Sequence, residues 1–413
     1  MPTRVFVTGA GVVSSLGYGR QAFWEALLAG RSGVAPIASF DPEGIGRELA
    51  AEVQNFRARD HLTAAEARRM GRCSAYCVAA TRMALQDSRL GAQDIAAHRT
   101  AVVLGTTMGE AGVIAMLDRA WIESGPEAVC DRQVTHYGTT LLSINVARAI
   151  GARGLVITLP AACAAGNYAI GFAADLIRRG RADVVITGSA EIVEKLQYSG
   201  FARLGAMAPE KCQPFDLNRQ GLILGEGAGV FVLESEAHAV RRHAPVLAEV
   251  GGYGLACDAY HITRPHPDGV GTAHALRECV TSSGLRPDQV DFINAHGTAT
   301  RANDAVEARS LLEVFGNRPM PVSSIKSMSG HCMGASSALE AVACIETVRT
   351  GWYPPTINYE LADPECALNV VANTARQGPS DVVLNNSLAF GGYDAALIFA
   401  RPGVIPADAP ALS

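Results

Sequence analysis

The strongest constraint on the fold is an internal repeat that relates the second half of the chain to the first. Residues 183–189 (DVVITGS) share their Asp-Val-Val start and their final serine with residues 381–387 (DVVLNNS). Residues 225–233 are matched in the same way by residues 391–399, because both segments run from glycine into an apolar stretch. Similar units in the same order predict a duplicated fold.

Shorter matches follow in the same order along both halves. They pair Ser88 and Leu90 with Ser283 and Leu285, Gly105-Thr106 with Gly297-Thr298, and Cys163-x-x-Gly166 with His331-x-x-Gly334. Alternating strand-like and helix-like segments predict two βαβ-rich units with pseudo-twofold symmetry. A break near residues 235–246 divides the chain into an N-terminal half, 1–245, and a C-terminal half, 246–413. We expect equivalent helix N-termini to face each other and to bring Cys163 and His331 to one central site.

The stretch around Cys163 predicts a nucleophile. A β-branched run at 155–158 reads as a buried strand, and a helical period begins after Cys163. Alanines and a glycine crowd the turn between them, so a ligand can approach the backbone closely. A helix N-terminus carries partial positive charge and favours the thiolate. The alternative is a buried, inert cysteine, and the strand–turn–helix context favours the nucleophile.

Composition and charge exclude several classes of function. The 413 residues are 48% hydrophobic and 18% charged, as expected of a globular protein, and the net charge of −5 argues against nucleic acid as a partner. No signal peptide and no membrane-spanning apolar run are evident, so we expect a cytoplasmic protein without a membrane partner. Ten cysteines without ligand spacing predict free thiols and no metal. The strand and glycine turn at 5–11 lacks the third glycine of a dinucleotide site, because Ser14 stands there.

Three loops of small residues in the second half supply further polar groups. They are residues 294–300 (NAHGTAT), 324–331 (SIKSMSGH) and 385–392 (NNSLAFGG). A zinc site made by Cys163 and the two histidines is disfavoured, because His296 and His331 are far apart in sequence and lack ligand spacing. Each histidine alone could be a hydrogen-bonded core residue. Their position in small-residue loops at the ends of elements favours a functional role.

These motifs together, in this order, resemble those of the β-ketoacyl–acyl carrier protein synthases of the KAS II type, which belong to the thiolase superfamily. The resemblance extends over residues 3–402. It implies an α/β thiolase-like fold in which two duplicated halves form an αβαβα layered arrangement. It also implies an acyltransferase that needs no cofactor, since the substrates arrive on the phosphopantetheine arm of an acyl carrier protein.

The resemblance further implies a decarboxylative Claisen condensation. Cys163 would hold the acyl chain as a thioester, while His296 and His331 bind the malonyl thioester carbonyl. Backbone N–H groups of Cys163 and Phe390 would hold the oxyanion. Lys326 would order the charges, with Glu340 as its partner.

Other implied roles concern substrate and carrier binding. Thr298 and Thr300 match threonines that contact the phosphopantetheine arm. Met108 and Phe201 match the acyl pocket and Phe390 its gate, although ordinary core packing explains all three equally well. Arg68 and Arg69 resemble a docking patch for an acidic carrier protein, and a solvated helix face is the alternative.

Several positions depart from the common family pattern. Leu388-Ala389 alters the gate loop, Tyr393-Asp394 replaces Thr-Asn, Arg301 replaces a proline and Ala161 a threonine. An alanine at 389 restricts the backbone of the loop. These changes favour a polyketide or polyene pathway over housekeeping fatty-acid elongation, which remains the alternative.

Other classes of protein fit the motifs less well. A thiolase would have a second cysteine in residues 388–392, and a chain-length subunit would lack Cys163. A simple Cys–His hydrolase gives no reason for two histidines and Lys326. A decarboxylating or chain-length partner of a ketosynthase heterodimer stays a further alternative. The family pattern implies either a homodimer or a heterodimer with a ketosynthase-like chain-length subunit.

Overall fold

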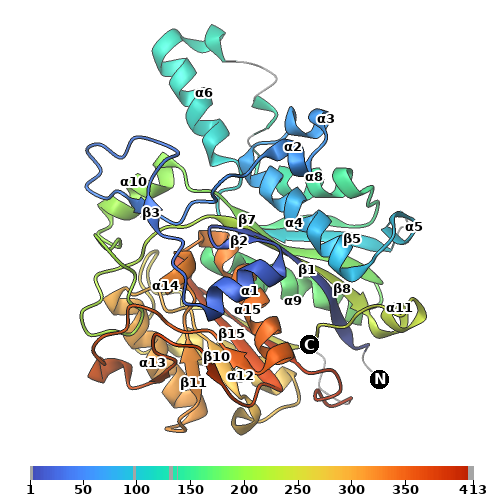
Figure 1. Cartoon of the computed structure of the whole chain (residues 1–413), viewed down its shortest axis with the longest axis vertical. Helices are drawn as coiled ribbons and strands as arrows, with labels where there is room; N and C mark the ends of the chain where they lie inside the picture. The colour runs from blue at the N-terminus through green and yellow to red at the C-terminus, as the bar shows by residue number, and fades with distance from the viewer. Residues whose placement is uncertain (1–2, 96–98, 130–133, 137, 408–413) are drawn as a thin grey trace.

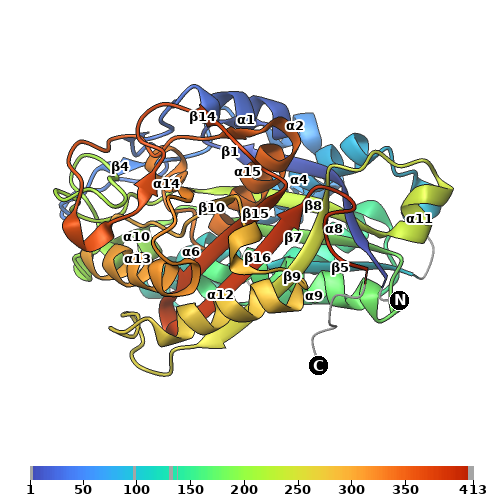
Figure 2. The ribbon, with the colours of Figure 1, turned by 90° about the horizontal axis from the view of Figure 1, so that it is seen from below.

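One mixed sheet runs through both halves of the chain in the computed structural model, which describes residues 3–95, 99–129, 134–136 and 138–407 (Figures 1 and 2). Its strand order is β13-β11-β10-β15-β16-β9-β1-β8-β7-β5-β6, with β2 paired to β1. The first-half strands are β1 Val5–Ser14, β2 Gly17–Tyr18, β5 Thr100–Gly105, β6 Val156–Leu159, β7 Val184–Glu191 and β8 Gly227–Ser235. The second-half strands are β9 Ala248–Cys257, β10 Phe292–Asn294, β11 Pro321–Ser323, β13 Asn369–Val370, β15 Val382–Ala389 and β16 Tyr393–Ala400.

Helices cover the sheet in layers, as the family resemblance implied. The helices α9 (Ala165–Arg178) and α15 (Ser336–Thr350) contact each other and strands of both halves, so they form the central layer. On the outer faces, α4 (Arg72–Ser88) and α8 (Leu141–Ile150) cover the first half, and α12 (Val270–Ser282) covers the second, with α13 (Arg301–Phe315) beside it. The αβαβα arrangement is therefore confirmed.

The structure also contains further helices and two small sheets. The helices are α1 Arg20–Leu28, α2 Ala58–His61, α3 Ala64–Ala67, α5 Ala92–Ile95, α6 Ala111–Ser124, α10 Lys195–Arg203, α11 Glu236–Arg241 and α14 Lys326–Ser329. Two small sheets pair β3 (Ala35–Pro36) with β4 (Leu49–Ala50) and β12 (Trp352–Tyr353) with β14 (Arg376–Gln377). Figure 1 shows α6 projecting away from the layered body. Among the described residues, no helix has the length and apolarity that crossing a bilayer requires.

The strand register confirms two of the repeat matches together. Ser189 of β7 pairs with Gly229 of β8, and Ser387 of β15 pairs with Ala395 of β16. Ser189 and Ser387 are matched positions of the repeat, and so are Gly229 and Ala395. The two strand pairs are therefore equivalent, as the repeat predicts. The two halves meet at the centre of the sheet, where Val5, Phe6 and Val7 of β1 pair with β9.

The predicted match between Cys163 and His331 is wrong by three residues. Short 3₁₀ turns precede α9 and α15, at Ala162–Ala164 and Met333–Ala335, and each begins with a residue at φ 46°. This shared backbone conformation makes Gly334 the equivalent of Cys163. His331 stands three residues before Gly334, and its side chain still lines the cavity that Cys163 lines.

The glycine turn predicted at 5–11 is also absent, because β1 continues through Ser14. A Cβ at Gly9 would lie 2.3 Å from the Ala84 carbonyl, and one at Gly11 would lie 1.9 Å from that of Ala80. These glycines therefore let α4 pack closely against the strand. The helical structure is interrupted between α3 and α4, where a Cβ at Gly71 would lie 2.0 Å from Glu110 Oε2.

Candidate active site

Cys163 lies in the sharp turn between β6 and α9 and is 5% exposed. The left-handed φ at Ala162 bends the chain before it, as the crowd of small residues predicted. The Ser337 hydroxyl at the start of α15 accepts the backbone N–H groups of Gly166 and Asn167, at 2.9 and 3.2 Å. Because free N–H groups at a helix start need acceptors, this contact fixes the two central helices end to end.

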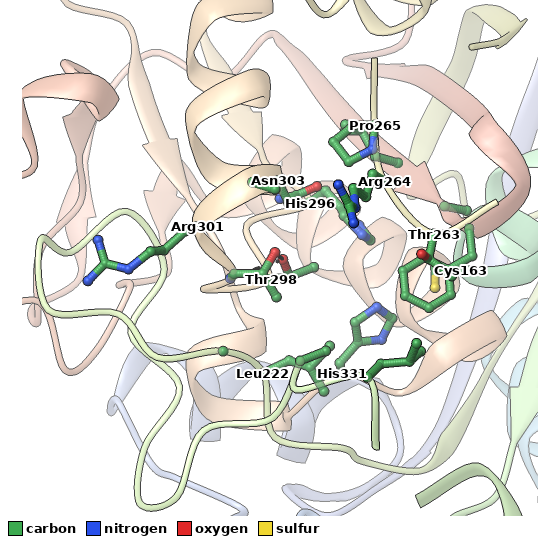
Figure 3. Close-up of a pocket in the computed structure, with 18 of the residues that line it drawn as sticks. Cys163, Leu222, Thr263, Arg264, Pro265, His296, Thr298, Arg301, Asn303 and His331 are labelled. Atoms are coloured by element: carbon green, nitrogen blue, oxygen red, sulfur yellow. Dashed lines mark hydrogen bonds between the residues drawn. The ribbon is translucent and has the colours of Figure 1, made fainter. Parts of the chain in front are cut away.

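A cavity of about 490 Å³ opens over the sulfur (Figure 3). His296 and His331 line it together with Cys163, so the structure brings the three predicted reactive side chains to one space. Other predicted residues that line it are Thr298, Thr300, Phe201 and Phe390. In the part of the chain that the structure describes, no three His, Cys, Asp or Glu side chains are grouped to hold a metal ion.

His331 is held in one tautomer by its own neighbours. Its Nδ1 accepts the Met333 backbone N–H at 2.9 Å, and the Ser336 hydroxyl lies 3.2 Å from the same atom. Burial, together with the charge of Lys326, lowers the pKa of His331 well below its ordinary value. The ring is therefore neutral near neutral pH, and its proton lies on Nε2.

His296 is held in the same way by a different group. Its Nδ1 is 3.1 Å from Lys326 Nζ, which also donates to the His296 carbonyl at 2.6 Å and pairs with Glu340. An ammonium can only donate, so Nδ1 accepts and Nε2 carries the proton. Burial lowers the pKa of His296 well below its ordinary value, with Lys326 and His331 adding to the effect. Lys326 and Glu340 form the ion pair expected from the sequence, and both are buried.

Glu307 of α13 positions the loop that carries His296, and the sequence did not reveal it. Its carboxylate accepts the backbone N–H groups of His296 and Gly297 at 2.7 and 2.8 Å, and the Asn386 amide at 2.7 Å. Burial raises the pKa of Glu307 to about 7. Glu191 has a similar role in the first half, where it accepts the Thr107 N–H at 2.6 Å.

Burial and charge have opposite effects on the Cys163 thiol. Burial raises the pKa of Cys163 to about 12, against the lowering effects of Lys326 and of the Phe390 backbone N–H. Desolvation therefore opposes the thiolate that the start of α9 is expected to favour. The Phe390 N–H is close enough to the sulfur to lower its pKa, which places this donor beside the atom that would attack a substrate.

The remaining predicted residues divide into two groups. Inside the cavity, the Phe201 ring stacks on Phe390 at 5.5 Å, and the hydroxyls of Thr298 and Thr300 lie 2.9 Å apart. Met108 is not part of the cavity wall, and its backbone N–H donates to Glu191 at 3.3 Å. Arg68 and Arg69 are exposed at the end of α3, outside the cavity wall.

Comparison with known proteins places this geometry in context. Models of the beta-ketoacyl synthase N-terminal and C-terminal domains match residues 3–239 and 247–360. A 3-oxoacyl-[acyl-carrier-protein] synthase 2 from Synechocystis sp. is 37% identical over 411 residues, which cover 96% of this chain and 98% of the relative.

Solved structures are similar over almost the whole chain. A chain of the ishigamide ketosynthase/chain length factor superposes with a TM-score of 0.94 at 41% identity, covering 98% of this chain and 100% of that one. A second structure holds a type II polyketide synthase acyl-carrier protein in complex with its ketosynthase bound to the hexaketide. One of its chains has a TM-score of 0.90 at 30% identity and covers 97% of this chain and 100% of that one.

Proposed function

The chain belongs to the beta-ketoacyl synthase family, and on that premise we propose that Cys163, His296 and His331 catalyse a decarboxylative condensation in a type II polyketide or polyene pathway. The activity class is that of a 3-oxoacyl-acyl carrier protein synthase, an acyltransferase. One observation carries the assignment of roles: two neutral imidazoles with their protons on Nε2 line the same cavity as one thiol.

Acyl transfer to Cys163 is the first step. The sulfur attacks the carbonyl of an acyl thioester, a new carbon–sulfur bond forms, and the carrier's thiol leaves with the proton of the Cys163 thiol. Negative charge collects on the carbonyl oxygen in between. The backbone N–H groups of Cys163 and Phe390 would hold that oxygen, and losing one such donor costs roughly 10²–10³ in rate.

Decarboxylation of malonyl bound to the carrier is the second step. Loss of CO₂ leaves an electron pair that spreads onto the thioester oxygen as an enolate. The Nε2–H groups of His296 and His331 would donate to this oxygen and stabilise its charge. The enolate carbon then attacks the Cys163 thioester, and the carbon–sulfur bond breaks to release a β-ketoacyl chain on the carrier and the Cys163 thiolate, which takes a proton from water to return the thiol.

Two observations support a polyketide or polyene pathway. The ishigamide and hexaketide structures are both similar over nearly the full chain. The gate loop also departs from the common family pattern at Leu388 and Ala389, and both residues line the cavity. Elongation in housekeeping fatty-acid synthesis is the second candidate, and the Synechocystis relative supports it.

A second subunit and an acyl carrier protein are the partners of this function. Trp121 and Ile122 of α6 are 61% and 85% exposed, and β6 forms an open edge of the sheet beside the exposed Leu155. Large exposed apolar side chains and an unpaired strand edge favour burial against another chain. The ishigamide structure pairs a ketosynthase with a chain length factor, and we propose a similar heterodimer here, with a homodimer as the alternative.

Intact-protein mass spectrometry tests the function directly. Acyl-loaded carrier proteins of several chain lengths are offered first, and malonyl carrier protein follows. We expect an acyl adduct that Cys163→Ala abolishes, then a product two carbons longer together with CO₂. The preferred acyl chain distinguishes the pathways. Malonyl decarboxylation without any acyl adduct would overturn the condensing role and favour a decarboxylating partner subunit.

A further inference from the structure

Two carboxyl groups of the second half meet beside the gate loop, and the mechanism above does not use them. Asp394 of β16 is 2% exposed, and one of its carboxyl oxygens lies beside Gly271 together with one of Asp258, which follows β9. Both residues line the reaction cavity. Asp394 stands where the common family pattern has asparagine, so the pair distinguishes this chain from that pattern.

The facing oxygens of the pair lack any other donor. Within the described residues, Asp258 Oδ1 and Asp394 Oδ2 are buried without a conventional donor. A Cβ added to Gly271 would lie 2.4 Å from Asp258 Oδ1 and 2.6 Å from Asp394 Oδ2. Two ionised carboxylates cannot hydrogen-bond each other, because neither has a proton to donate. A hydrogen bond between these two oxygens would therefore require a proton on one of them.

The outer oxygens are satisfied by ordinary donors. Asp394 Oδ1 accepts the Thr272 hydroxyl at 3.2 Å, and Asp258 Oδ2 accepts the His266 backbone N–H at 2.8 Å. Both carboxyl groups are thus fixed in orientation from behind. Their inner oxygens both lie beside Gly271, and neither has a donor among the described residues.

The pair is attached to the turn that carries the Phe390 N–H. The Asp258 N–H donates to the Gly392 carbonyl at 2.9 Å, and the Gly391 N–H donates to the Ile262 carbonyl at 2.8 Å. Asp394 lies two residues after Gly392 on the same chain. A hydrogen bond between the carboxyl groups therefore closes a ring through the backbone of the turn.

Other ionisable groups around the pair do not neutralise it. Burial raises the pKa of Asp394 to about 8, with Asp258 and Glu307 of α13 adding to the rise. Tyr168 of α9 also faces Asp394, as part of a group with Cys257 and Tyr393. His266 contacts Asp258 through its backbone, and Arg264 lines the cavity. In the described chain, no lysine or arginine forms an ion pair with either carboxyl group.

We propose that Asp258 and Asp394 share one proton and act as positioning residues, whose hydrogen bond holds the 390–392 turn and its Phe390 N–H against Cys163. This inference rests on the proposed function, because it assigns the turn to acyl transfer. Loss of the shared proton leaves two adjacent negative charges, which repel each other and push the turn away from the sulfur. Acyl transfer then declines as the pH rises past neutrality, about tenfold for each further pH unit once the proton is mostly lost.

Asp394→Asn is the discriminating variant, since its amide donates to Asp258 at every pH. The measured quantity is the rate of Cys163 acylation by an acyl-N-acetylcysteamine thioester, from about pH 6 to about pH 9.5. The ratio of variant to wild-type rate removes the shared effect of thiol ionisation. We expect this ratio to be near one below pH 7. Once the two carboxyl groups have lost their shared proton, the ratio should rise about tenfold per pH unit.

Asp291→Asn is the matched control. Asp291 precedes β10, and its carboxylate accepts the Val382 N–H at 2.9 Å, remote from the turn. We expect its ratio to the wild type to stay constant with pH. Hydrogen–deuterium exchange over residues 386–394, corrected for intrinsic exchange, should accelerate at alkaline pH in the wild type and not in Asp394→Asn.

The outcomes separate this inference from the proposed function. No acylation of Cys163 at any pH would overturn the proposed function itself. Normal acylation with the same pH profile in Asp394→Asn and the wild type would leave that function intact and overturn the shared proton. A rate that is low in Asp394→Asn at all pH values, with an unchanged profile, would do the same, because a purely structural role predicts it.

Discussion

The rings of His296 and His331 lie 5.5 Å apart between centroids, with their planes at 89° to each other. Their Nδ1 atoms are occupied by Lys326 and by the Met333 N–H, so each ring keeps its Nε2 proton for the cavity. Two perpendicular donors can approach one carbonyl oxygen along its two lone pairs. Under the proposed function, this relationship predicts that the histidines act as hydrogen-bond donors and not as general bases.

Malonyl decarboxylation should therefore not weaken in mild acid. Burial lowers the pKa of both histidines, so they stay neutral as the pH falls below their ordinary value. We expect CO₂ release by Cys163→Ala, in which acyl transfer is absent, to be constant between about pH 7.5 and about pH 5.5. Histidines of ordinary pKa would give a rate that depends on pH across this range, and that result would contradict the assignment.

Lys326→Met should destabilise the fold as well as the site. Removing one partner of a buried ion pair costs about 3–5 kcal/mol, because Glu340 stays buried without its cation. The double variant Lys326→Met/Glu340→Leu should regain most of this free energy of unfolding in urea titrations. Decarboxylation should be low in both, since His296 Nδ1 loses its donor. Equal stability of the single and double variants would show that the pair is not coupled.

Gly392→Ala should impair acyl transfer beyond its effect on stability. Gly392 has φ 76°, and a Cβ there would lie 3.0 Å from the Asp258 Cβ. Gly44, at φ 79°, has nothing within 4 Å of such a Cβ, so Gly44→Ala introduces the same backbone strain of about 1 kcal/mol without a clash. We expect slower Cys163 acylation in Gly392→Ala alone. Equal acylation rates in the two variants would count against the role of the turn.

Arg68 and Arg69 should matter only for carrier-bound substrates. Replacing both with glutamate should lower kcat/KM for acyl carrier protein about tenfold or more at low salt, and less at high salt, because exposed charges are screened. Acylation by a small thioester should be unchanged. Arg181→Glu, exposed beyond the end of α9 opposite to Cys163, is the control. Equal losses of kcat/KM with both substrates would show that the substitutions disturb the fold and not carrier docking.

The sequence predicted best where chemistry and local pattern coincide. Cys163, His296 and His331 each lie in a run of small residues between elements, and the structure brings all three to one cavity. Glu307 gave no such signal, because a carboxylate in the first turns of a helix looks like a solvated side chain. Its role depends on the approach of α13 to the His296 loop, which is a property of tertiary packing.

The wrong predictions concern segments rich in small residues, because such residues occur both in turns and where elements pack closely. The glycines of β1 indicated a turn, yet they serve the close packing of α4. The repeat register slipped by three residues at His331, because alanine and glycine recur on both sides of the match and the shared feature is a backbone angle. The prediction of a thiolate at Cys163 rests on a helix N-terminus, which can be read from sequence, whereas the depth of burial that opposes ionisation cannot.

The central position of β1 also determines the order in which the chain can fold during synthesis. Val5 pairs with Ser235 on one side and with Val250 on the other, and it is synthesised before both of them. At about 5–20 residues per second, both partners emerge on the order of 10–50 s later. The strand that joins the two halves is made before both of its partners and cannot pair until they emerge. A chaperone that shields the apolar β1 segment is therefore expected to raise the yield of this protein more than one acting on the completed chain.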